Sequence, residues 1–503
     1  MYHVRVVVTG SGAKAVQVIC YVRRKRAVVH HVGSAHDDAE VDALLSGAQE
    51  WIAQQTHQLS AFPETTSDNI LLLNQCEYLG VYYTFLLDIL NGLQQRIGYT
   101  NLDTSSLLND LVTMRVMEPA SKLRSIELLE IYFGIRHRRQ RFYEAAPRWL
   151  NLKQEVEKRT LRFAKDEFQF DYRLLFYDVT TLYFETFEAD KIRKPGFSKD
   201  NKPDQPQILV ALMVTQEGFP VTYEIFAGNT FEGHTLIPVI ESFIKKHQVK
   251  NFTVVADAAM ISSDNVLALK KAGIHYIVGA RLGNLSEETF KRMDQQLLRQ
   301  DGQLTRLNTD NGFLICAFSQ TRFRKDKHEM DKQIARANVL IQQPSQNRKT
   351  KFVKAQQQKL ELNQELIAKT TKLLGVKGYY TDLPEDHVSS QTIIERYHDL
   401  YKIEQAFRVS KHDLQTRPVF HFKEEPIRLH ILICFMALAV SKFIELKTNI
   451  SLRVFLTQCK KVTDARLLNK LTGKVITLRT SIPNDMTNLL NYLRLEAEGL
   501  SIG

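Results

Sequence analysis

The 503-residue sequence contains only five cysteines, and no two of them form a C-x-x-C pair. Because they are scattered and odd in number, the sequence indicates neither a disulfide framework nor a zinc site. We expect reduced, buried thiols in a cytosolic protein. The five are Cys20, Cys76, Cys316, Cys434 and Cys459.

Long hydrophobic runs and targeting segments are also missing. The longest apolar run, Ile431 to Val440, is too short to cross a bilayer and predicts a buried helix. The N-terminal MYHVRVVVTG lacks the apolar segment and cleavage site of a secretion signal, so we expect a cytoplasmic protein with no membrane partner. Gly10 and Gly12 are not followed by the Lys-Ser/Thr of a phosphate-binding loop, and no nucleotide site is predicted.

What the sequence does have is an excess of positive charge. Its 67 Lys and Arg residues exceed its 56 Asp and Glu residues, which gives a net charge of +11 and a pI near 9.2. This balance favours a polyanionic partner, although many basic proteins never bind nucleic acid. The hydrophobic content of 44% is ordinary for a globular protein, and the length allows two to four domains.

The N-terminal third predicts a hairpin, then helices. Residues 1–65 contain β-rich segments around a turn at Gly10 to Gly12, followed by a helical pattern, and residues 66–168 are helical in periodicity almost throughout. This second region holds the densest basic cluster, RHRRQR, whose cations are Arg136, Arg138, Arg139 and Arg141. A solvated loop or helix end and a DNA contact are about equally good interpretations of it.

The pattern changes at residue 169, where apolar strands begin. Three strands, a helix, a strand, a helix and a strand follow in order, and this order is typical of an RNase H-like α/β core. A polar, basic stretch then interrupts the core, with RFRKDKH at 322–328 and RKTKFVK at 348–354. We therefore predict a core in two parts, 169–281 and 379–450, an insertion domain at 282–378 and a helical C-terminal tail at 451–503.

A helix is predicted for ERYHDLYKIEQAFRVSK, residues 395–411. At about 100° per residue, one narrow stripe of this helix holds a phenol, a carboxylate and two cations. A solvated face with ordinary ion pairs is the alternative. The stripe consists of Tyr397, Glu404, Arg408 and Lys411.

Two carboxylates lie on apolar strands, where an ionised group is costly unless a metal or partner compensates it. They are Asp178 and Asp257. The first and fourth strands of an RNase H-like sheet are neighbours, so these side chains would converge, and Glu404 on a later helix would complete the set. Three hard oxygen ligands without a His or Cys cluster suit Mg²⁺ or Mn²⁺. A strand-end carboxylate that caps a loop is the alternative for either Asp alone.

The helix at 395–411 resembles a signature of DDE-class insertion-sequence transposases, the large IS-four-like group. That group carries Y-x-x-R-x-x-x-E-x-x-x-x-x-x-K around its last catalytic carboxylate, and Tyr397, Glu404 and Lys411 match at the right spacing. Leu400 stands where the pattern has Arg. Further similar segments occur in the expected order: E-P-A-S-K-L at 118–123, Y-D-V-T-T-L-Y-F at 177–184, G-F-S-K-D at 196–200, P-Q-I at 206–208 and G-N-T at 228–230.

The resemblance implies a bacterial, nucleoid-associated enzyme that binds terminal inverted repeats and target DNA, acts as a synapsed homodimer and needs a divalent ion. Asp178, Asp257 and Glu404 would then hold the metal for DNA cleavage and strand transfer. Two other interpretations stay open: a DNA-binding protein derived from a transposase, and an RNase H-like nuclease that hydrolyses without joining.

Overall fold

The computed structural model describes residues 2–22, 25–56, 73–197, 204–249, 251–260, 262–343, 350–356, 359–417, 419, 421–470 and 472–495. Within it the chain forms two compact units. The smaller unit combines Met1–Gly92, Ile126–His137 and Arg453–Gly503, and the larger combines Leu93–Ser125 with Arg138–Leu452. Segments from both ends of the sequence therefore build one unit.

The smaller unit begins with an antiparallel sheet, β1 (Tyr2–Val8), β2 (Lys14–Val22) and β3 (Lys25–Ala35), followed by α1 (Asp38–Thr56). The expected turn is present, with Gly12 at φ 82° donating its N–H to the Thr9 carbonyl. α1 covers one face of the sheet, and Val16, Val18 and Leu44 are buried there. The β-rich stretch after the turn forms two strands, since β2 and β3 pair with each other.

A second sheet in this unit corrects two expectations. Residues 66–168 were expected to be helical almost throughout, yet Cys76–Tyr82 forms strand β4, and residues 57–72 lie outside the described part. The predicted helical C-terminal tail also contains strands, β15 (Asp464–Asn469) and β16 (Val475–Arg479), between α15 (Leu452–Cys459) and α16 (Asn484–Tyr492). β15 pairs with β4 across nearly 400 residues of sequence, so long-range pairing overrides the local helical pattern.

Helices open the larger unit. The helices are α2 (Thr84–Ile97), α3 (Leu107–Met117), α4 (Lys122–Phe133), α5 (Arg139–Trp149) and α6 (Lys153–Phe168), of which α2 and α4 have residues in both units. Every residue of α3 is buried, and α3 packs against α14 (Glu424–Thr448). By length and composition α14 could cross a membrane, but 89% of its most apolar window is buried inside the protein. It is the interior helix that the apolar run at 431–440 predicts.

One mixed sheet of eight strands forms the centre of the larger unit, in the order β10-β11-β14-β9-β8-β5-β6-β7. β5, β8 and β9 are parallel, and the other neighbours are antiparallel. All residues of β6 and β8 are buried, as expected where helices cover both faces. The bounds are β5 (Leu174–Tyr183), β6 (Gln207–Val214), β7 (Pro220–Ala227), β8 (Thr253–Ala256), β9 (His275–Ala280), β10 (Leu304–Thr309), β11 (Gly312–Phe318) and β14 (Val376–Thr381).

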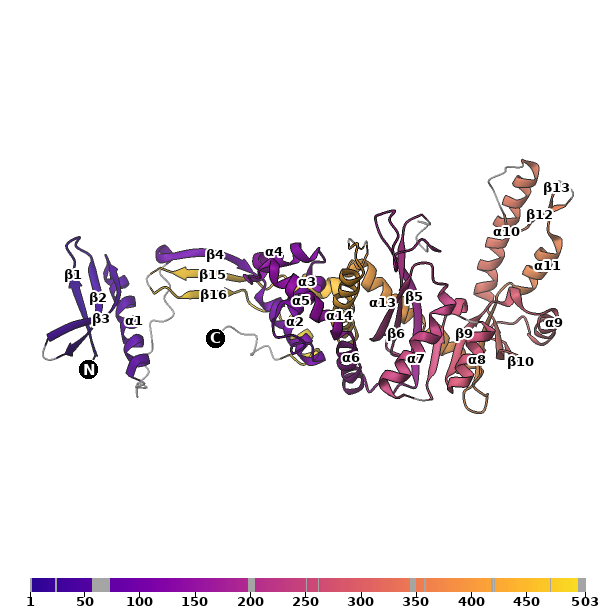
Figure 1. Cartoon of the computed structure of the whole chain (residues 1–503), viewed down its shortest axis with the longest axis horizontal. Coiled ribbons are helices and arrows are strands. Elements are labelled where there is room, and N and C mark those ends of the chain that lie inside the picture. Colours follow the sequence, from indigo (N-terminus) through magenta and orange to yellow (C-terminus); the bar gives the residue numbers. More distant parts are fainter. Residues whose placement is uncertain are drawn as a thin grey trace. The chain divides into compact units, whose positions relative to one another are not determined.

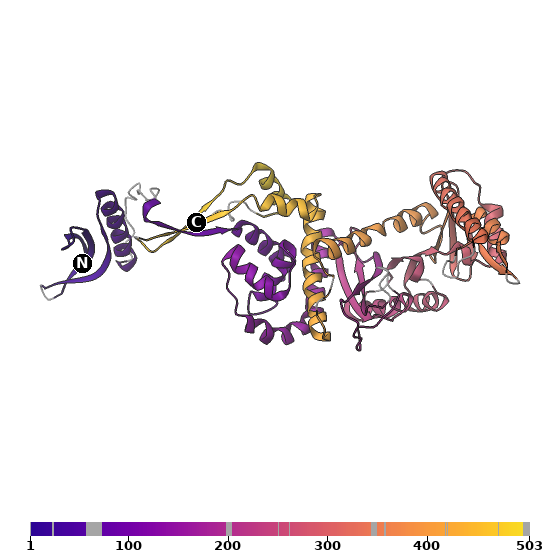
Figure 2. The same ribbon diagram turned by 90° about the horizontal axis from the view of Figure 1, so that it is seen from above.

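The α/β class is confirmed, and so is the expected order of elements: β5, β6, β7, α7 (Leu236–His247), β8, α8 (Ser263–Ala272) and β9. Figures 1 and 2 show α10 (Gln320–Gln342) and α11 (Gln364–Leu373) together beyond β9, beside the small β12–β13 ribbon (Val353–Gln356 and Lys359–Leu362). The predicted insertion, 282–378, also supplies α9 (Glu287–Gln296) and strands β10 and β11 of the main sheet, and its predicted end falls within β14.

Candidate active site

Strand register brings two of the predicted carboxylates side by side. β5 and β8 run parallel, and their last registered pair is Tyr177 with Ala256. Asp178 follows within β5, and Asp257 comes directly after the last residue of β8, so the alternation of side chains would place both on the same face of the sheet. Buried apolar residues precede both on these strands, whereas Asp178 is half-buried and Asp257 is exposed.

Hydrogen bonds fix the orientation of both carboxylates. Oδ1 of Asp178 accepts the N–H of Val179 at 2.7 Å, and Oδ1 of Asp257 accepts the N–H of Ala258 at the same distance. Oδ1 of Asp257 also accepts the hydroxyl of Tyr397 at 3.2 Å. Tyr397 was expected to contact DNA, but its side chain is buried at 7% exposure and orients Asp257 instead.

The approach of Tyr397 depends on a glycine in β9. A Cβ on Gly279 would lie 2.6 Å from the Tyr397 hydroxyl oxygen, which is too close for any side chain. Burial beside Asp257 and Glu404 raises the pKa of Tyr397, because a phenolate would be desolvated and repelled there. The hydroxyl therefore stays protonated and donates its hydrogen to the carboxylate.

The helix predicted for 395–411 is broken. α12 (Ser390–His398) ends before Asp399, and α13 (Tyr401–Arg408) continues into a π-helical turn, Val409–Asp413. At the break, the N–H groups of Leu400, Lys402 and Ile403 each bond the carbonyl three residues back, a tighter turn than the α-helix. The prediction of one straight helix, with its four polar residues along a single stripe, is therefore wrong.

Glu404 is exposed on α13, which lies against β5 and β6. It shares its surroundings with Asp257, because both carboxylates oppose the lowering of the pKa of Lys377 by burial and by Arg322. Lys377, on β14, places its Nζ 4.7 Å from the centre of the Tyr397 ring. The carboxylates of Asp257 and Glu404 thus both lie within electrostatic range of the Lys377 ammonium.

The donor chemistry of this neighbourhood fits a hard divalent cation, since carboxylate oxygens are the ligands that Mg²⁺ and Mn²⁺ prefer. Among the residues that the structure describes, no group of three His, Cys, Asp or Glu side chains lies close enough to hold a metal. Like charges without a counterion repel one another, and this disfavours a tight cluster of Asp178, Asp257 and Glu404.

The predicted DNA-contacting residues occupy separate positions. Arg408 is exposed at the end of α13, one turn after Glu404, and Lys411 is half-buried in the π-helical turn. Arg136, Arg138, Arg139 and Arg141 are all exposed, in a loop and in the first turn of α5. Arg136 pairs with Glu130 at 2.7 Å.

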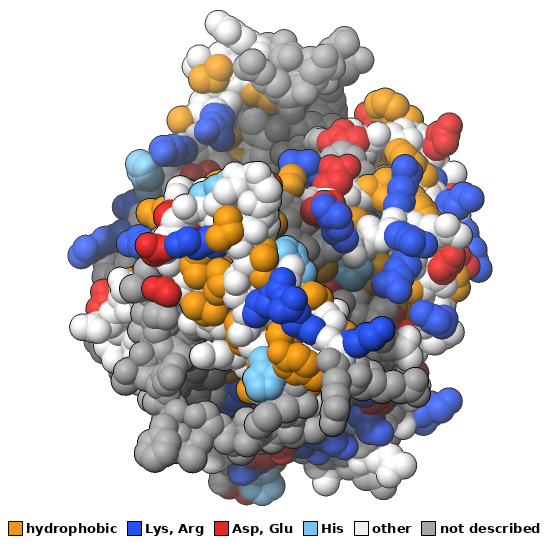
Figure 3. Space-filling model, turned by 90° about the vertical axis from the view of Figure 1, so that its left-hand side faces the viewer, with side chains coloured by type: hydrophobic (Ala, Val, Ile, Leu, Met, Phe, Trp, Pro, Cys, Tyr) orange, Lys and Arg blue, Asp and Glu red, His pale blue; other side chains and the backbone are white. Residues whose placement is uncertain are grey.

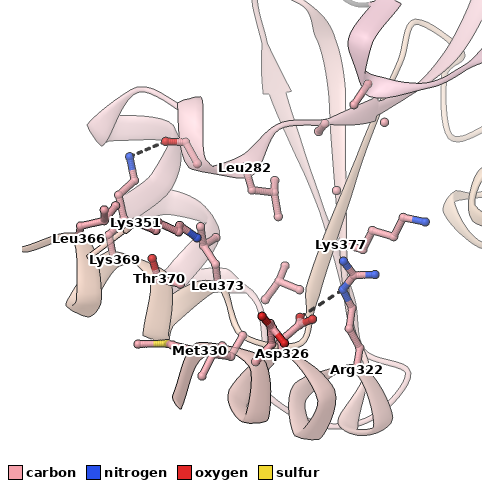
Figure 4. Close-up of a pocket in the computed structure, with 18 of the residues that line it drawn as sticks. Leu282, Arg322, Asp326, Met330, Lys351, Leu366, Lys369, Thr370, Leu373 and Lys377 are labelled. Atoms are coloured by element: carbon pink, nitrogen blue, oxygen red, sulfur yellow. Dashed lines mark hydrogen bonds and ion pairs between the residues drawn. The ribbon is translucent and has the colours of Figure 1, made fainter. Parts of the chain in front are cut away.

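A pocket of about 600 Å³ begins at Asp257 and Tyr397 and extends between the sheet and helices α10 and α11. Figure 4 shows Arg322 directed toward Lys377 on one side and Lys351 with Lys369 on the other, around apolar side chains. Sequence reasoning found Arg322 through its basic segment and missed Lys377, a single lysine in an apolar strand. Only the pairing of β14 with β9 brings it near the carboxylates.

Glycines of the G-F-S-K-D and G-N-T segments serve backbone packing. A Cβ on Gly196 would lie 2.1 Å from the carbonyl oxygen of Gly228, and a Cβ on Gly228 would lie 2.0 Å from that of Gln207. The Gln207 amide donates to the Gly228 and Phe197 carbonyls at 3.1 and 2.9 Å. These contacts tie the loop after β5 to the edges of β6 and β7, while residues 198–200 lie outside the described part.

Comparison with known proteins gives a family. Residues 169–440, more than half of the chain, match the transposase DDE domain. The piggyBac transposase, in a synaptic complex with hairpin DNA, is 10% identical, with 82% of this chain and 76% of that chain covered and a TM-score of 0.37. The Mos1 transposase, in a paired-end complex with the left transposon end, is 12% identical, with 46% and 66% covered and a TM-score of 0.16. No curated protein sequence matches. The match over 169–440 shows that the chain belongs to the transposase DDE domain family.

Proposed function

We propose that this protein is an insertion-sequence transposase of the IS-four-like group, which binds terminal inverted repeats and cuts and joins DNA with Mg²⁺ or Mn²⁺. The observation that carries the proposal is the register of β5 and β8, which sets Asp178 beside Asp257 where β8 ends between the interior strands of the sheet, a place that we call the carboxylate edge. An RNase H-like core is supported by the strand order β7-β6-β5-β8-β9, with the first strand between the second and the fourth.

Each residue near this edge has a role in the proposed reaction. Asp178, Asp257 and Glu404 would hold the metal, which activates a water or a 3′-hydroxyl and stabilises the leaving oxygen. Tyr397 keeps Asp257 oriented through its hydroxyl hydrogen bond. Lys377 would contact a phosphate beside the scissile bond. Its half-buried ammonium lies near the carboxylates and could donate a charge-assisted hydrogen bond to a phosphate oxygen of the bound DNA.

The proposed partners are the two transposon ends and a target DNA, brought together by a homodimer. Arg408 and Lys411 lie on the same segment as Glu404 and would position the strand that is cut. The exposed arginines of 136–141 would neutralise phosphates farther away. The departure at Leu400 removes one side chain of the group's pattern, and Arg408 is the nearest cation on the exposed side of α13.

The test is cleavage of a labelled duplex that carries the element's own terminal repeat, with and without Mg²⁺. Asp257→Asn keeps the shape of the side chain and removes its charge, so we expect cleavage to fall by at least about 10³-fold while DNA binding persists. Asp386→Asn is the matched control, because Asp386 is 79% exposed and is not part of the pocket at Asp257.

Two outcomes would replace the proposal. Cleavage by Asp257→Asn at the parental rate would leave a DNA-binding protein derived from a transposase, whose carboxylates have no catalytic role. Parental protein that cuts the repeat but never joins it to a target duplex would identify a nuclease.

A further inference from the structure

The N-terminal sheet has one face that α1 does not cover. Strand register defines this face, because directly paired residues point to the same side. Across β1, β2 and β3 the row Arg5–Gln17–His31 lies on it, as do the row His3–Ile19–Val28 and the pair Tyr21–Arg26. We call the surface of these eight residues the open face.

The alternation of side chains along the strands shows that the open face points away from α1. Val16 and Val18 of β2 belong to the core with α1, so the alternate residues Gln17, Ile19 and Tyr21 point to the other side. In β3 the two neighbouring histidines divide in the same way. His30 stacks on Trp51 of α1 with ring centres 4.9 Å apart, while His31, paired with Gln17, is exposed.

Charge is separated between the two layers of this module. The first 36 residues, which contain all three strands, include six Lys and Arg residues and no Asp or Glu. α1 has the reverse composition, with Asp38, Glu40, Asp42 and Glu50 and no Lys or Arg. Among the described cations, Arg5 and Arg26 lie on the open face, and Lys14 and Lys25 lie on the side of α1, which carries the acidic residues. A surface of this kind attracts a polyanion and repels an acidic protein.

Polar side chains of β1 and β2 lie side by side at the centre of the open face. Nε of Arg5 and Oε1 of Gln17 have no hydrogen-bond partner among the described residues, and the two residues are directly paired across β1 and β2. Both residues are half-buried, so the rest of each side chain is accessible from the open face. Tyr21, 61% exposed, extends beside them. Figure 3 shows hydrophobic, Lys/Arg and His side chains side by side on the side of the molecule turned toward the viewer, together with some Asp and Glu side chains.

We propose that the open face binds the sugar-phosphate backbone of duplex DNA, as a second contact surface separate from the carboxylate edge. The seven residues of β1 span about 24 Å, and the two outer strands of the sheet lie about 10 Å apart, so the open face is wide enough to contact several phosphates of a duplex, which carries one charge per about 1.7 Å of its axis. Arg5 and Arg26 donate to phosphates, and His3, Gln17 and Tyr21 supply polar and aromatic contacts around them. The inference rests on the proposed function only for the identity of the polyanion.

The experiment measures the salt dependence of binding by the full-length protein. The probe is a fluorescent duplex of roughly 30 base pairs of arbitrary sequence, titrated at several salt concentrations between about 50 and 200 mM, since phosphate contacts are independent of sequence. Removing two contacts with R5A/R26A should flatten the log-log slope by about 1.8, and R26A alone by about 0.9. Arg26→Lys keeps the charge and should keep the slope.

Lys14→Ala is the matched control. Lys14 also lies on β2, but it pairs with Ala35 on the covered side and forms an ion pair with Asp38 of α1. Lys14→Ala also removes one positive charge from this sheet, but from the side away from the open face. The log-log slope of its DNA binding should therefore equal that of the parent. Because Arg26 is exposed, R26A should fold normally, and thermal melting checks this.

Two results would overturn the inference. The first is an unchanged slope for R5A/R26A, and the second is a loss of self-association in sedimentation with no change in DNA binding, which would make the open face a contact between two copies of the chain. Cleavage of the terminal repeat, measured on the same variants, tests the proposed function independently. If R5A/R26A shows the parental slope and cleavage is intact, only the inference that the open face binds DNA is rejected.

Discussion

Two regions of the larger unit bring like charges together, carboxylates in one and basic groups in the other, and the repulsion is relieved differently in the two. At the carboxylate edge, Asp178 is half-buried, and Asp257 and Glu404 are exposed. In the second region, around the first half of α14, Lys122 and the α14 residue His430 are buried. Their neighbours Arg115, Cys434 and His421 complete that second cluster, in which Nζ of Lys122 lies 2.5 Å from Nε2 of His421.

The buried cluster relieves its repulsion by losing protons. Burial and the charge of Arg115 lower the pKa of Lys122 to about 7, and burial with Lys122 lowers the pKa of His421 to about 4. His430 is held neutral too, because burial lowers its pKa, and Nε2 donates to the Thr416 carbonyl at 3.0 Å. The carboxylate edge is open to solvent, so an incoming cation can compensate it. In the buried cluster, a strongly shifted pKa therefore accompanies a structural role. At the carboxylates, accessibility to solvent and ions is what points to chemistry.

The largest expected effect comes from removing charge at the accessible edge. Glu404→Gln keeps the shape and helix propensity of the side chain, so we expect DNA cleavage to fall by at least about 10³-fold with binding unchanged or slightly stronger. Glu395→Gln is the matched control on α12, since Glu395 is exposed and bonds only Gln391 among the described residues. Equal cleavage by both variants would remove Glu404 from the catalytic set.

The sequence predicted the carboxylates better than their surroundings. Asp178 and Asp257 could be selected because apolar, β-branched residues precede both, a local signal that survives folding. Lys377 and Gly279 gave no such signal, since their roles arise from pairing between β9 and β14, about a hundred residues apart. The break at Asp399 and Leu400 was missed because the apolar periodicity of 395–411 passes through it without a Gly or Pro.

The buried cluster contains a residue of a sequence motif whose structural role the sequence did not predict. Lys122 belongs to the E-P-A-S-K-L segment, which sequence resemblance placed upstream of the catalytic core. The structure places its ammonium in the interior beside His421, 299 residues away. Strands β4 and β15 were misjudged for the same reason, since their pairing partners are remote in sequence.

Leu400→Arg tests whether the turn before α13 faces DNA, as Glu404 is proposed to do, or is part of the protein interior. Leu400 is 7% exposed at the break between α12 and α13, so an arginine there would bring an unpaired charge into the interior. We expect the free energy of unfolding to fall by about 3 kcal/mol, measured by urea denaturation. A neutral or more active variant would show that this position faces DNA.

Lys122→Met tests the buried cluster, where the expected effect is smaller and depends on pH. The pKa of Lys122 is about 7 in the folded protein and near 10.5 when unfolded, so the unfolded chain binds more protons between these values and stability rises with pH across that window. Below pH 7 the folded protein must bury the charge in full. The methionine should therefore stabilise by about 2 kcal/mol at pH 6 and flatten the rise between pH 7 and 10.

The control for this variant is Lys461→Met, because Lys461 is exposed and a change there leaves the buried charges untouched. Denaturation across the pH range should give the parental curve for it. A parental curve for Lys122→Met as well would mean that His421, and not Lys122, takes up the proton in this cluster.

The smallest effect is expected at Tyr397, which connects the edge to the sheet behind it. Tyr397→Phe removes the hydroxyl that donates to Oδ1 of Asp257 and keeps the ring that packs on Tyr379, with ring centres 4.9 Å apart. Asp257 keeps its bond from the Ala258 N–H, so its orientation should loosen without being lost. We expect the rate of cleavage to fall by about tenfold at saturating Mg²⁺, with stability changed by less than about 1 kcal/mol. Because the lost hydroxyl acts on a metal-holding carboxylate, the Mg²⁺ concentration for half-maximal cleavage should rise, and Tyr379→Phe should leave it unchanged. An unaltered Mg²⁺ dependence in Tyr397→Phe would reduce Tyr397 to a packing residue and leave Asp257 oriented by its own backbone alone.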